Sequence, residues 1–187
     1  MGLKVDRKLI PNLLTSSRFF FGAFAALLYL LSIVLGDCKR IFISFSLVLL
    51  IISIVTDYLD GELARRWNCC SNFGKIYDPL ADKLIVSSFL VLFSFSSVLH
   101  WIVPLFSVLR EVITEWIRYQ LKKIGVFLAA IKSAKYKTAL QFGGLTIALF
   151  SSIWWTSSTF ASLLFLPSLL LSFLSLSSYL SKYWEYY

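Results

Sequence analysis

The chain has 187 residues, of which 58% are hydrophobic and only 15% are charged. A soluble domain of this length is usually nearer half apolar and a quarter charged, so the composition argues against a soluble domain and favours a membrane protein. The net charge of +8 could suggest nucleic-acid binding. The basic residues lie between apolar runs, however, and this fits an anionic membrane surface better than nucleic acid.

Six apolar runs follow one another along the chain, and each predicts a membrane-spanning helix. They cover about residues 13–35, 41–57, 82–99, 101–122, 137–155 and 160–180. Each is near the ~20 residues that a helix needs to cross ~30 Å of hydrocarbon. Residues 1–9 predict a short interfacial segment, followed by Pro11 in the first turn of a helix. We therefore expect an all-α polytopic membrane protein with six transmembrane helices, forming a single domain over residues 1–187.

Basic residues predict the orientation of these helices. They gather before the first run, between the second and third, and between the fourth and fifth, whereas the other side has only Lys39, Arg40 and His100. The side richer in Lys and Arg is normally cytoplasmic, so we expect both termini in the cytoplasm. No small-residue cleavage site follows the first run, which we interpret as a retained span. The three cysteines, Cys38, Cys69 and Cys70, fall in predicted loops without a nearby His, so a zinc site is not expected.

Four aspartates between residues 57 and 82 carry the strongest functional signal. Asp57 and Asp60 are three apart and Asp78 and Asp82 four apart, so each pair shares one helix face. Pro79 predicts that Asp78 is the N-cap of the third helix. Carboxylates near lipid are costly unless compensated, and oxygen ligands favour Mg²⁺ or Mn²⁺ over zinc. Four of them can hold two such ions at the cytoplasmic ends of two helices.

Small and basic residues accompany the aspartates. Gly61 removes a side chain where a ligand could approach, Ala64 keeps the next turn small, and Gly74 shapes the loop entering the third helix. Arg65 offers a planar fork of donors that suits a phosphate. The alternative is that the aspartates lie in a solvated loop and pair with neighbouring Arg and Lys residues.

The fourth run contains two arginines on one face. Arg110 and Arg118 are eight apart with Thr114 midway, and cations inside a span normally face the protein interior. They would suit an acceptor that carries a phosphate. Alternatively, Arg118 pairs with Glu115 at i,i+3, while adjacent Glu111 is expected to point away from Arg110.

The aspartate pattern resembles the signature of the CDP-alcohol phosphotransferases. The pattern is Asp-x2-Asp-Gly-x2-Ala-Arg followed by Gly-x3-Asp-x3-Asp, and its eight positions are Asp57, Asp60, Gly61, Ala64, Arg65, Gly74, Asp78 and Asp82. The resemblance implies an integral membrane enzyme with a six-helix core, usually homodimeric, that needs Mg²⁺ or Mn²⁺. Such enzymes displace CMP from a CDP-linked substrate by an alcohol. The resemblance covers about residues 8–150, and the last span matches only in hydrophobicity.

Three further segments are similar to bacterial phosphatidylglycerophosphate synthases. They are residues 10–18, Arg110-Glu111 with Arg118, and residues 135–141. Ala134 stands where that subfamily usually has glycine. This likeness implies CDP-diacylglycerol and glycerol 3-phosphate as substrates and a bacterial inner membrane as the location. Lys135 and Lys137 have an alternative role as positive-inside anchors.

The resemblance also implies roles for individual residues. Asp57, Asp60 and Asp78 are metal ligands, while Asp82 is the general base and also a metal ligand. Residues implied for the CDP-lipid are Asn12, Thr15, Gly61, Ala64, Arg65 and Gly74; residues implied for the acceptor phosphate are Arg110, Arg118 and Lys135. The open alternatives are another acceptor (inositol, inositol phosphate, serine or phosphatidylglycerol), a cation transporter, or a membrane scaffold without activity.

Overall fold

The computed structural model describes residues 9–66, 72–124, 132–154 and 158–186, with only the backbone described for residues 9–16, 60–61, 63–66, 72–80, 132–135 and 186. Six helices occupy these ranges: α1 (Leu9–Leu35), α2 (Lys39–Arg66), α3 (Asn72–Phe95), α4 (Ile102–Lys123), α5 (Lys132–Trp154) and α6 (Ser158–Tyr186). These ranges contain no strand, so the predicted all-α fold is confirmed. The predicted interfacial segment, apart from its last residue, and the pair Cys69 and Cys70 lie outside the described residues.

Within the described ranges, three helices are long and apolar enough to cross a membrane, judged by length and composition. Their candidate spans are Ser17–Leu35 in α1, Lys39–Leu59 in α2 and Ser158–Glu185 in α6. Helices α3, α4 and α5 have 24, 22 and 23 residues, which is also enough for ~30 Å of hydrocarbon. They carry more charged side chains, however, and crossing by all six helices stays a prediction. Large exposed apolar side chains such as Phe20, Phe45 and Leu170 give the protein a surface suited to lipid.

Several helices extend past their apolar runs at the ends predicted to be cytoplasmic. Helix α2 continues beyond Asp57 to Arg66, and α3 already begins at Asn72. The predictions that Asp78 caps α3 and that Gly74 shapes the loop before it are therefore wrong, because Gly74, Asp78 and Pro79 all fall inside the helix. Hydropathy detects only the apolar stretch of a helix, whereas helical hydrogen bonding continues into polar residues. Proline is tolerated inside a helix when neighbouring groups compensate for the lost hydrogen bond.

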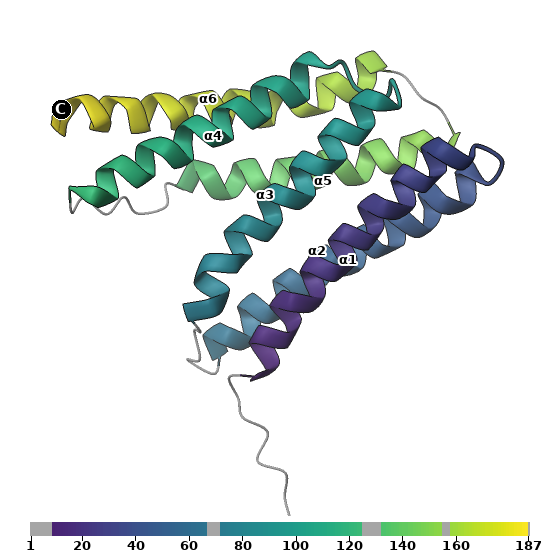
Figure 1. Ribbon diagram of the computed structural model, residues 1–187, viewed down its shortest axis with the longest axis horizontal. Coiled ribbons are helices and arrows are strands. Elements are labelled where there is room, and N and C mark those ends of the chain that lie inside the picture. The colour runs from purple at the N-terminus through teal and green to yellow at the C-terminus, as the bar shows by residue number, and fades with distance from the viewer. Residues whose placement is uncertain (1–8, 67–71, 125–131, 155–157, 187) are drawn as a thin grey trace, which may run out of the picture.

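Four of the six helices form two pairs, and the other two helices link these pairs (Figure 1). Helices α1 and α2 form an antiparallel hairpin, and α4 lies beside α6. Helix α3 packs against α1, α4 and α5, while α5 packs against α2 and α6. The hairpin turns at Gly36, whose φ of +67° lies in the left-handed region that favours glycine. Helices α3 and α5 thus connect the α1–α2 hairpin to the α4–α6 pair.

Small and polar residues allow close approach between the helices. A Cβ on Gly22 of α1 would lie 2.6 Å from Cγ1 of Ile85 on α3, so a larger residue at this position would require Ile85 to shift. In the buried core, the hydroxyl of Tyr29 on α1 hydrogen-bonds to Ser96 Oγ at 2.8 Å. The hydroxyl of Ser53 on α2 donates to the carbonyl oxygen of Arg18 on α1 at 3.2 Å. These contacts fix α1 against both helices that carry the aspartates.

Candidate active site

Five helices surround one cavity of about 920 Å³. Its wall includes Asp57 near the end of the α2 span, Asp82 on α3, Arg110 on α4, Lys137 near the beginning of α5 and Tyr179 on α6. The fold therefore brings predicted metal-binding and acceptor-binding residues from different helices into a single space. Ion pairs divide the charged residues of its wall into two groups. We call them the acidic end (Asp57 and Asp82, which contact Arg18) and the basic end (Lys83, Arg110, Arg118 and Lys137, which contact Glu111 and Glu115).

At the acidic end, Arg18 of α1 holds aspartates from two helices close together. Its side chain is 1% exposed, and Nη1 forms an ion pair with Asp57 Oδ1. The same nitrogen lies 3.7 Å from Oδ1 of Asp82 on α3. Asp57 is 49% exposed, so its carboxylate also faces the open cavity. Without a cation between them the two carboxylates would repel each other, and the guanidinium of Arg18 offsets that cost.

The described part of the acidic end fits a divalent cation. Asp57 and Asp82 converge on one positively charged atom and offer oxygen donors, which hard ions such as Mg²⁺ and Mn²⁺ prefer. Asp60 lies in α2 one turn after Asp57, and Asp78 lies in α3 one turn before Asp82, but their side chains are outside those described. Among the described side chains, no group of three or more potential metal-binding residues occurs. The complete four-aspartate set therefore remains a prediction.

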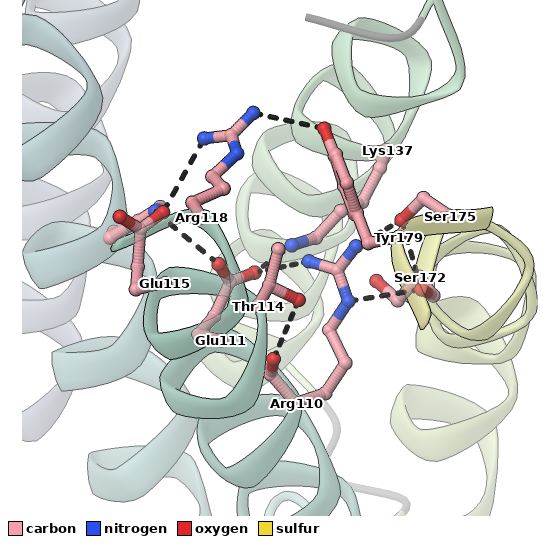
Figure 2. Close-up of polar contacts among 10 residues, drawn as sticks. Arg110, Glu111, Thr114, Glu115, Arg118, Lys137, Ser172, Ser175 and Tyr179 are labelled. Carbon is pink, nitrogen blue, oxygen red and sulfur yellow. Dashed lines mark hydrogen bonds and ion pairs between the residues drawn. The ribbon is translucent and has the colours of Figure 1, made fainter. Parts of the chain in front are cut away.

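At the basic end, Arg110 is held by α6 as well as by its own helix (Figure 2). It is 5% exposed. Its Nε donates to the carbonyl oxygen of Ser172 at 2.9 Å, and Nη2 donates to Ser175 Oγ. Its Nη1 donates to Glu111 Oε1 at 3.0 Å. Every nitrogen of this guanidinium therefore has a partner, which is what a buried cation requires.

Glu111 is the shared anion of the basic end. Its Oε1 contacts both Arg110 Nη1 and Lys137 Nζ, and its Oε2 lies 3.7 Å from Lys83 Nζ. The prediction that Glu111 points away from Arg110 is wrong. Neighbouring residues on a helix diverge at Cβ, but the long arginine side chain reaches back to the adjacent carboxylate. One carboxylate thus holds cations from α3, α4 and α5 together.

Arg118 lies two helical turns further along α4. Its Nη1 lies 3.4 Å from Glu115 Oε1, as the internal-pairing alternative expects. Its Nη2 also donates to the hydroxyl oxygen of Tyr179 at 3.0 Å, and the guanidinium carbon lies 5.2 Å from the centre of that ring. Lys83 forms a second ion pair with Glu115. Thr114 donates to the carbonyl oxygen of Arg110 at 2.8 Å, so its hydroxyl is used by the backbone.

The basic end keeps an excess of positive charge among the residues that the structure describes. Its cations there are Lys83, Arg110, Arg118 and Lys137, and the carboxylates that contact them are Glu111 and Glu115. The four cations of this described set therefore exceed the two carboxylates by a formal charge of +2. A buried or half-buried cluster of this kind favours an anion with several oxygens, such as a phosphate monoester.

The structure gathers four of the predicted site residues around the cavity: Asp57, Asp82, Arg110 and Arg118. The side-chain positions of the others lie outside the described set, namely Asn12, Thr15, Asp60, Gly61, Ala64, Arg65, Gly74, Asp78 and Lys135. Those positions fall in α1, α2, α3 and α5, the helices that also carry described residues of the site.

Several charged or polar residues of the cavity wall were missing from the predicted site, among them Lys83, Glu111, Lys137 and Tyr179. Lys137 is 6% exposed and contacts Glu111, while Tyr179 is 1% exposed and contacts Arg118. For Lys137 the sequence held a signal, because Lys137 falls in the segment 135–141, which carries part of the resemblance to bacterial phosphatidylglycerophosphate synthases. For Tyr179 it held little, since the surrounding segment is rich in Ser and Leu throughout.

Comparison with known proteins gives a consistent result. A family model described as CDP-alcohol phosphatidyltransferase matches residues 8–178. Three relatives named CDP-diacylglycerol–glycerol-3-phosphate 3-phosphatidyltransferase are similar to the chain. The protein from Mycoplasma pneumoniae is 33% identical over 161 residues, covering 79% of this chain and 70% of the relative. The protein from Bacillus subtilis is 36% identical over 141 residues, covering 74% and 72%. The protein from Rickettsia prowazekii is 29% identical over 150 residues, covering 80% and 79%.

Proposed function

The chain belongs to the CDP-alcohol phosphatidyltransferase family, and on that premise we propose that it makes phosphatidylglycerol phosphate. In this reaction the phosphatidyl group moves from CDP-diacylglycerol to sn-glycerol 3-phosphate, and CMP is released. The names of the relatives support both substrates. The observation that carries the proposal is the single cavity with an acidic end and a basic end. It offers separate places for a metal-bound diphosphate and for an acceptor phosphate.

The acidic end is proposed to bind the CDP-lipid. Asp57, Asp60, Asp78 and Asp82 would hold two Mg²⁺ or Mn²⁺ ions, and the convergence of Asp57 and Asp82 on Arg18 supports this set. When bound, these ions neutralise the diphosphate and the leaving CMP. Arg65 is proposed to contact the same phosphates, with Asn12, Thr15, Gly61, Ala64 and Gly74 around the nucleotide.

The basic end is proposed to bind glycerol 3-phosphate. Arg110, Arg118 and Lys135 form the predicted phosphate site, to which Lys137 is added by its position on the cavity wall. A neutral acceptor such as inositol or serine would leave the excess positive charge of this end without a partner. The charge distribution therefore favours an acceptor that carries a phosphate.

For the chemical step, the proposed general base is Asp82 of the acidic end, as the family likeness implies. Asp82 is proposed to take the proton from the 1-hydroxyl of glycerol 3-phosphate, and this is supported by its place in the wall of the same cavity that holds the basic end. The acceptor oxygen then forms a bond to the β-phosphorus, and the bond from that phosphorus to the CMP oxygen breaks. CMP leaves as the anion, and the guanidinium of Arg65 is proposed to balance its charge.

We further propose a bacterial inner-membrane location with both termini in the cytoplasm. The distribution of basic residues supports this orientation, and the exposed apolar side chains support contact with lipid tails. In that orientation the cavity opens toward water-soluble glycerol 3-phosphate and Mg²⁺. A homodimer is proposed from the family likeness.

Measuring CMP release from CDP-diacylglycerol with one acceptor at a time tests the function. The acceptors are glycerol 3-phosphate, inositol phosphate, inositol, serine and phosphatidylglycerol, added to purified protein in detergent. We expect release with glycerol 3-phosphate to exceed release with every other acceptor by at least about tenfold. A preference for another acceptor would assign a different family reaction. No metal-dependent release with any of them, together with cation flux in vesicles, would instead support a transporter.

A further inference from the structure

Helix α6 supplies contacts that hold both arginines of the cavity, although its sequence matches the family only in hydrophobicity. The Ser172 carbonyl and the Ser175 hydroxyl accept hydrogen bonds from Arg110, and the Tyr179 hydroxyl accepts one from Arg118. These three positions are spaced by three and four residues, so they lie on one face of α6. Figure 2 shows that this face is turned toward α4, and Tyr179 also lines the cavity.

We propose that Tyr179 is a positioning residue, which orients Arg118 toward the phosphate of the acceptor; this rests on the proposed function. Tyr179 is 1% exposed, and its hydroxyl oxygen lies 3.0 Å from Arg118 Nη2. The guanidinium carbon lies 5.2 Å from the ring centre, within the range of a cation–π interaction. The tyrosine thus restrains the arginine by a hydrogen bond and by its ring.

The second partner of Arg118 is a weaker restraint. Glu115 is half-exposed, lies 3.4 Å from Arg118 Nη1, and is shared with Lys83. Exposed ion pairs that are shared and solvated hold a side chain loosely. Tyr179 is instead packed in a buried cluster with Ile117 and Leu121 of α4, which fixes its ring. The orientation of Arg118 therefore depends mainly on Tyr179.

A neutral hydroxyl has a chemical advantage in this position. A second carboxylate in place of Tyr179, in addition to Glu115, would neutralise Arg118 further and compete with the incoming phosphate. The hydroxyl oxygen of Tyr179 accepts a hydrogen bond but leaves the positive charge of the guanidinium in place. Arg118 is thereby oriented while its charge remains available to an anion in the cavity.

Tyr179→Phe tests the proposal, because it removes the hydroxyl and keeps the ring. We expect the KM for glycerol 3-phosphate to rise about tenfold, the size expected for losing a hydrogen bond to a charged group. The KM for CDP-diacylglycerol and kcat should change less than about twofold. Tyr29→Phe is the matched control, since Tyr29 is also 1% exposed and hydrogen-bonded, but lies in the α1–α3 core. It should leave both KM values unchanged.

A double-mutant cycle separates positioning from general damage. In an Arg118→Ala background, Tyr179→Phe should add less than about twofold to the KM for glycerol 3-phosphate. If Tyr179→Phe does not fold, Glu115→Gln tests the same proposal, because loss of the weaker restraint on Arg118 must raise the KM for glycerol 3-phosphate by less than about threefold. The proposal is overturned if the wild-type protein is active but Tyr179→Phe leaves the KM for glycerol 3-phosphate unchanged. It is also overturned if the two substitutions are additive. A wild-type protein that does not use glycerol 3-phosphate overturns the proposed function itself, and with it this role.

Discussion

The buried guanidinium of Arg18 on α1 forms an ion pair with the carboxylate of Asp57 on α2. This contact ties the first helix to the acidic end of the cavity. The same guanidinium nitrogen lies 3.7 Å from Asp82 on α3, so this cation compensates aspartates of two helices. A residue of the first helix therefore stabilises the arrangement that the proposed metal-binding carboxylates need.

Replacing Arg18 should destabilise the protein in a metal-dependent way. Arg18→Ala leaves Asp57 and Asp82 close together without the guanidinium between them, and we expect a loss of about 1–3 kcal/mol in the free energy of unfolding. A divalent ion bound by these carboxylates would restore part of that loss. Thermal unfolding in detergent should show that Mg²⁺ raises the Tm of Arg18→Ala more than the Tm of the wild type. Arg40→Ala, an exposed residue at the other end of α2, is the control and should behave like the wild type.

Replacing Asp82 should separate chemistry from binding. Asp82→Asn keeps the size of the side chain but removes the group that accepts the proton, so turnover should fall by about 10²-fold or more. Binding of CDP-diacylglycerol should remain mostly intact, as measured by ligand-dependent thermal stabilisation. The control is Asp37→Asn in the exposed α1–α2 turn. Lost CDP-lipid binding with normal turnover in the bound enzyme would count against Asp82 as the base.

Replacing Arg110 should affect one substrate selectively. Arg110→Ala removes a buried cation of the basic end, so we expect the KM for glycerol 3-phosphate to rise by about 10–100-fold. The KM for CDP-diacylglycerol should change by less than about threefold. Arg110→Lys keeps the charge but not the fork of donors, and should give an intermediate value. Equal rises in both KM values would contradict the assignment of Arg110 to the acceptor phosphate.

Gly22 should be required for the packing of α1 on α3. Gly22→Ala places a Cβ 2.6 Å from Ile85 Cγ1, and overpacking of this kind typically costs about 1–3 kcal/mol. In an Ile85→Ala background the same substitution should cost much less, because the obstructing atoms are gone. Gly143→Ala is the matched control, since a Cβ added at Gly143 would meet nothing within 4 Å. Tm values that fall equally for Gly22→Ala in both backgrounds would exclude this contact as the cause.

Much of the fold was predictable because lipid permits few structures. Backbone groups inside a membrane must bond within their own segment, so each long apolar run had to be a helix. The helix ends were not predictable from the same signal. Helices α2 and α3 continue into polar sequence, where hydropathy says nothing about backbone hydrogen bonding. For this reason Asp78, interpreted as a cap, lies inside α3.

The candidate site was predictable where its residues share one helix. The spacing of Arg110 and Arg118 predicted one common face of α4, and both residues lie on the cavity wall. Contacts between helices were not predictable, because they depend on how the helices pack. Tyr179 of α6 reaches Arg118 of α4 only in the folded protein, and Lys137 of α5 reaches Glu111 in the same way. A side chain that completes a site from a distant helix leaves no periodic signal of its own.

The central claim is that the acidic and basic ends of one cavity act together in a metal-dependent transfer to glycerol 3-phosphate. Incorporation of radiolabelled glycerol 3-phosphate into lipid by the purified protein tests this claim most directly. With CDP-diacylglycerol and Mg²⁺ or Mn²⁺ we expect labelled phosphatidylglycerol phosphate in equal amount to the CMP released, with no incorporation in EDTA and recovery on adding the metal back. Incorporation that persists in EDTA, or CMP release without labelled lipid, would contradict the account.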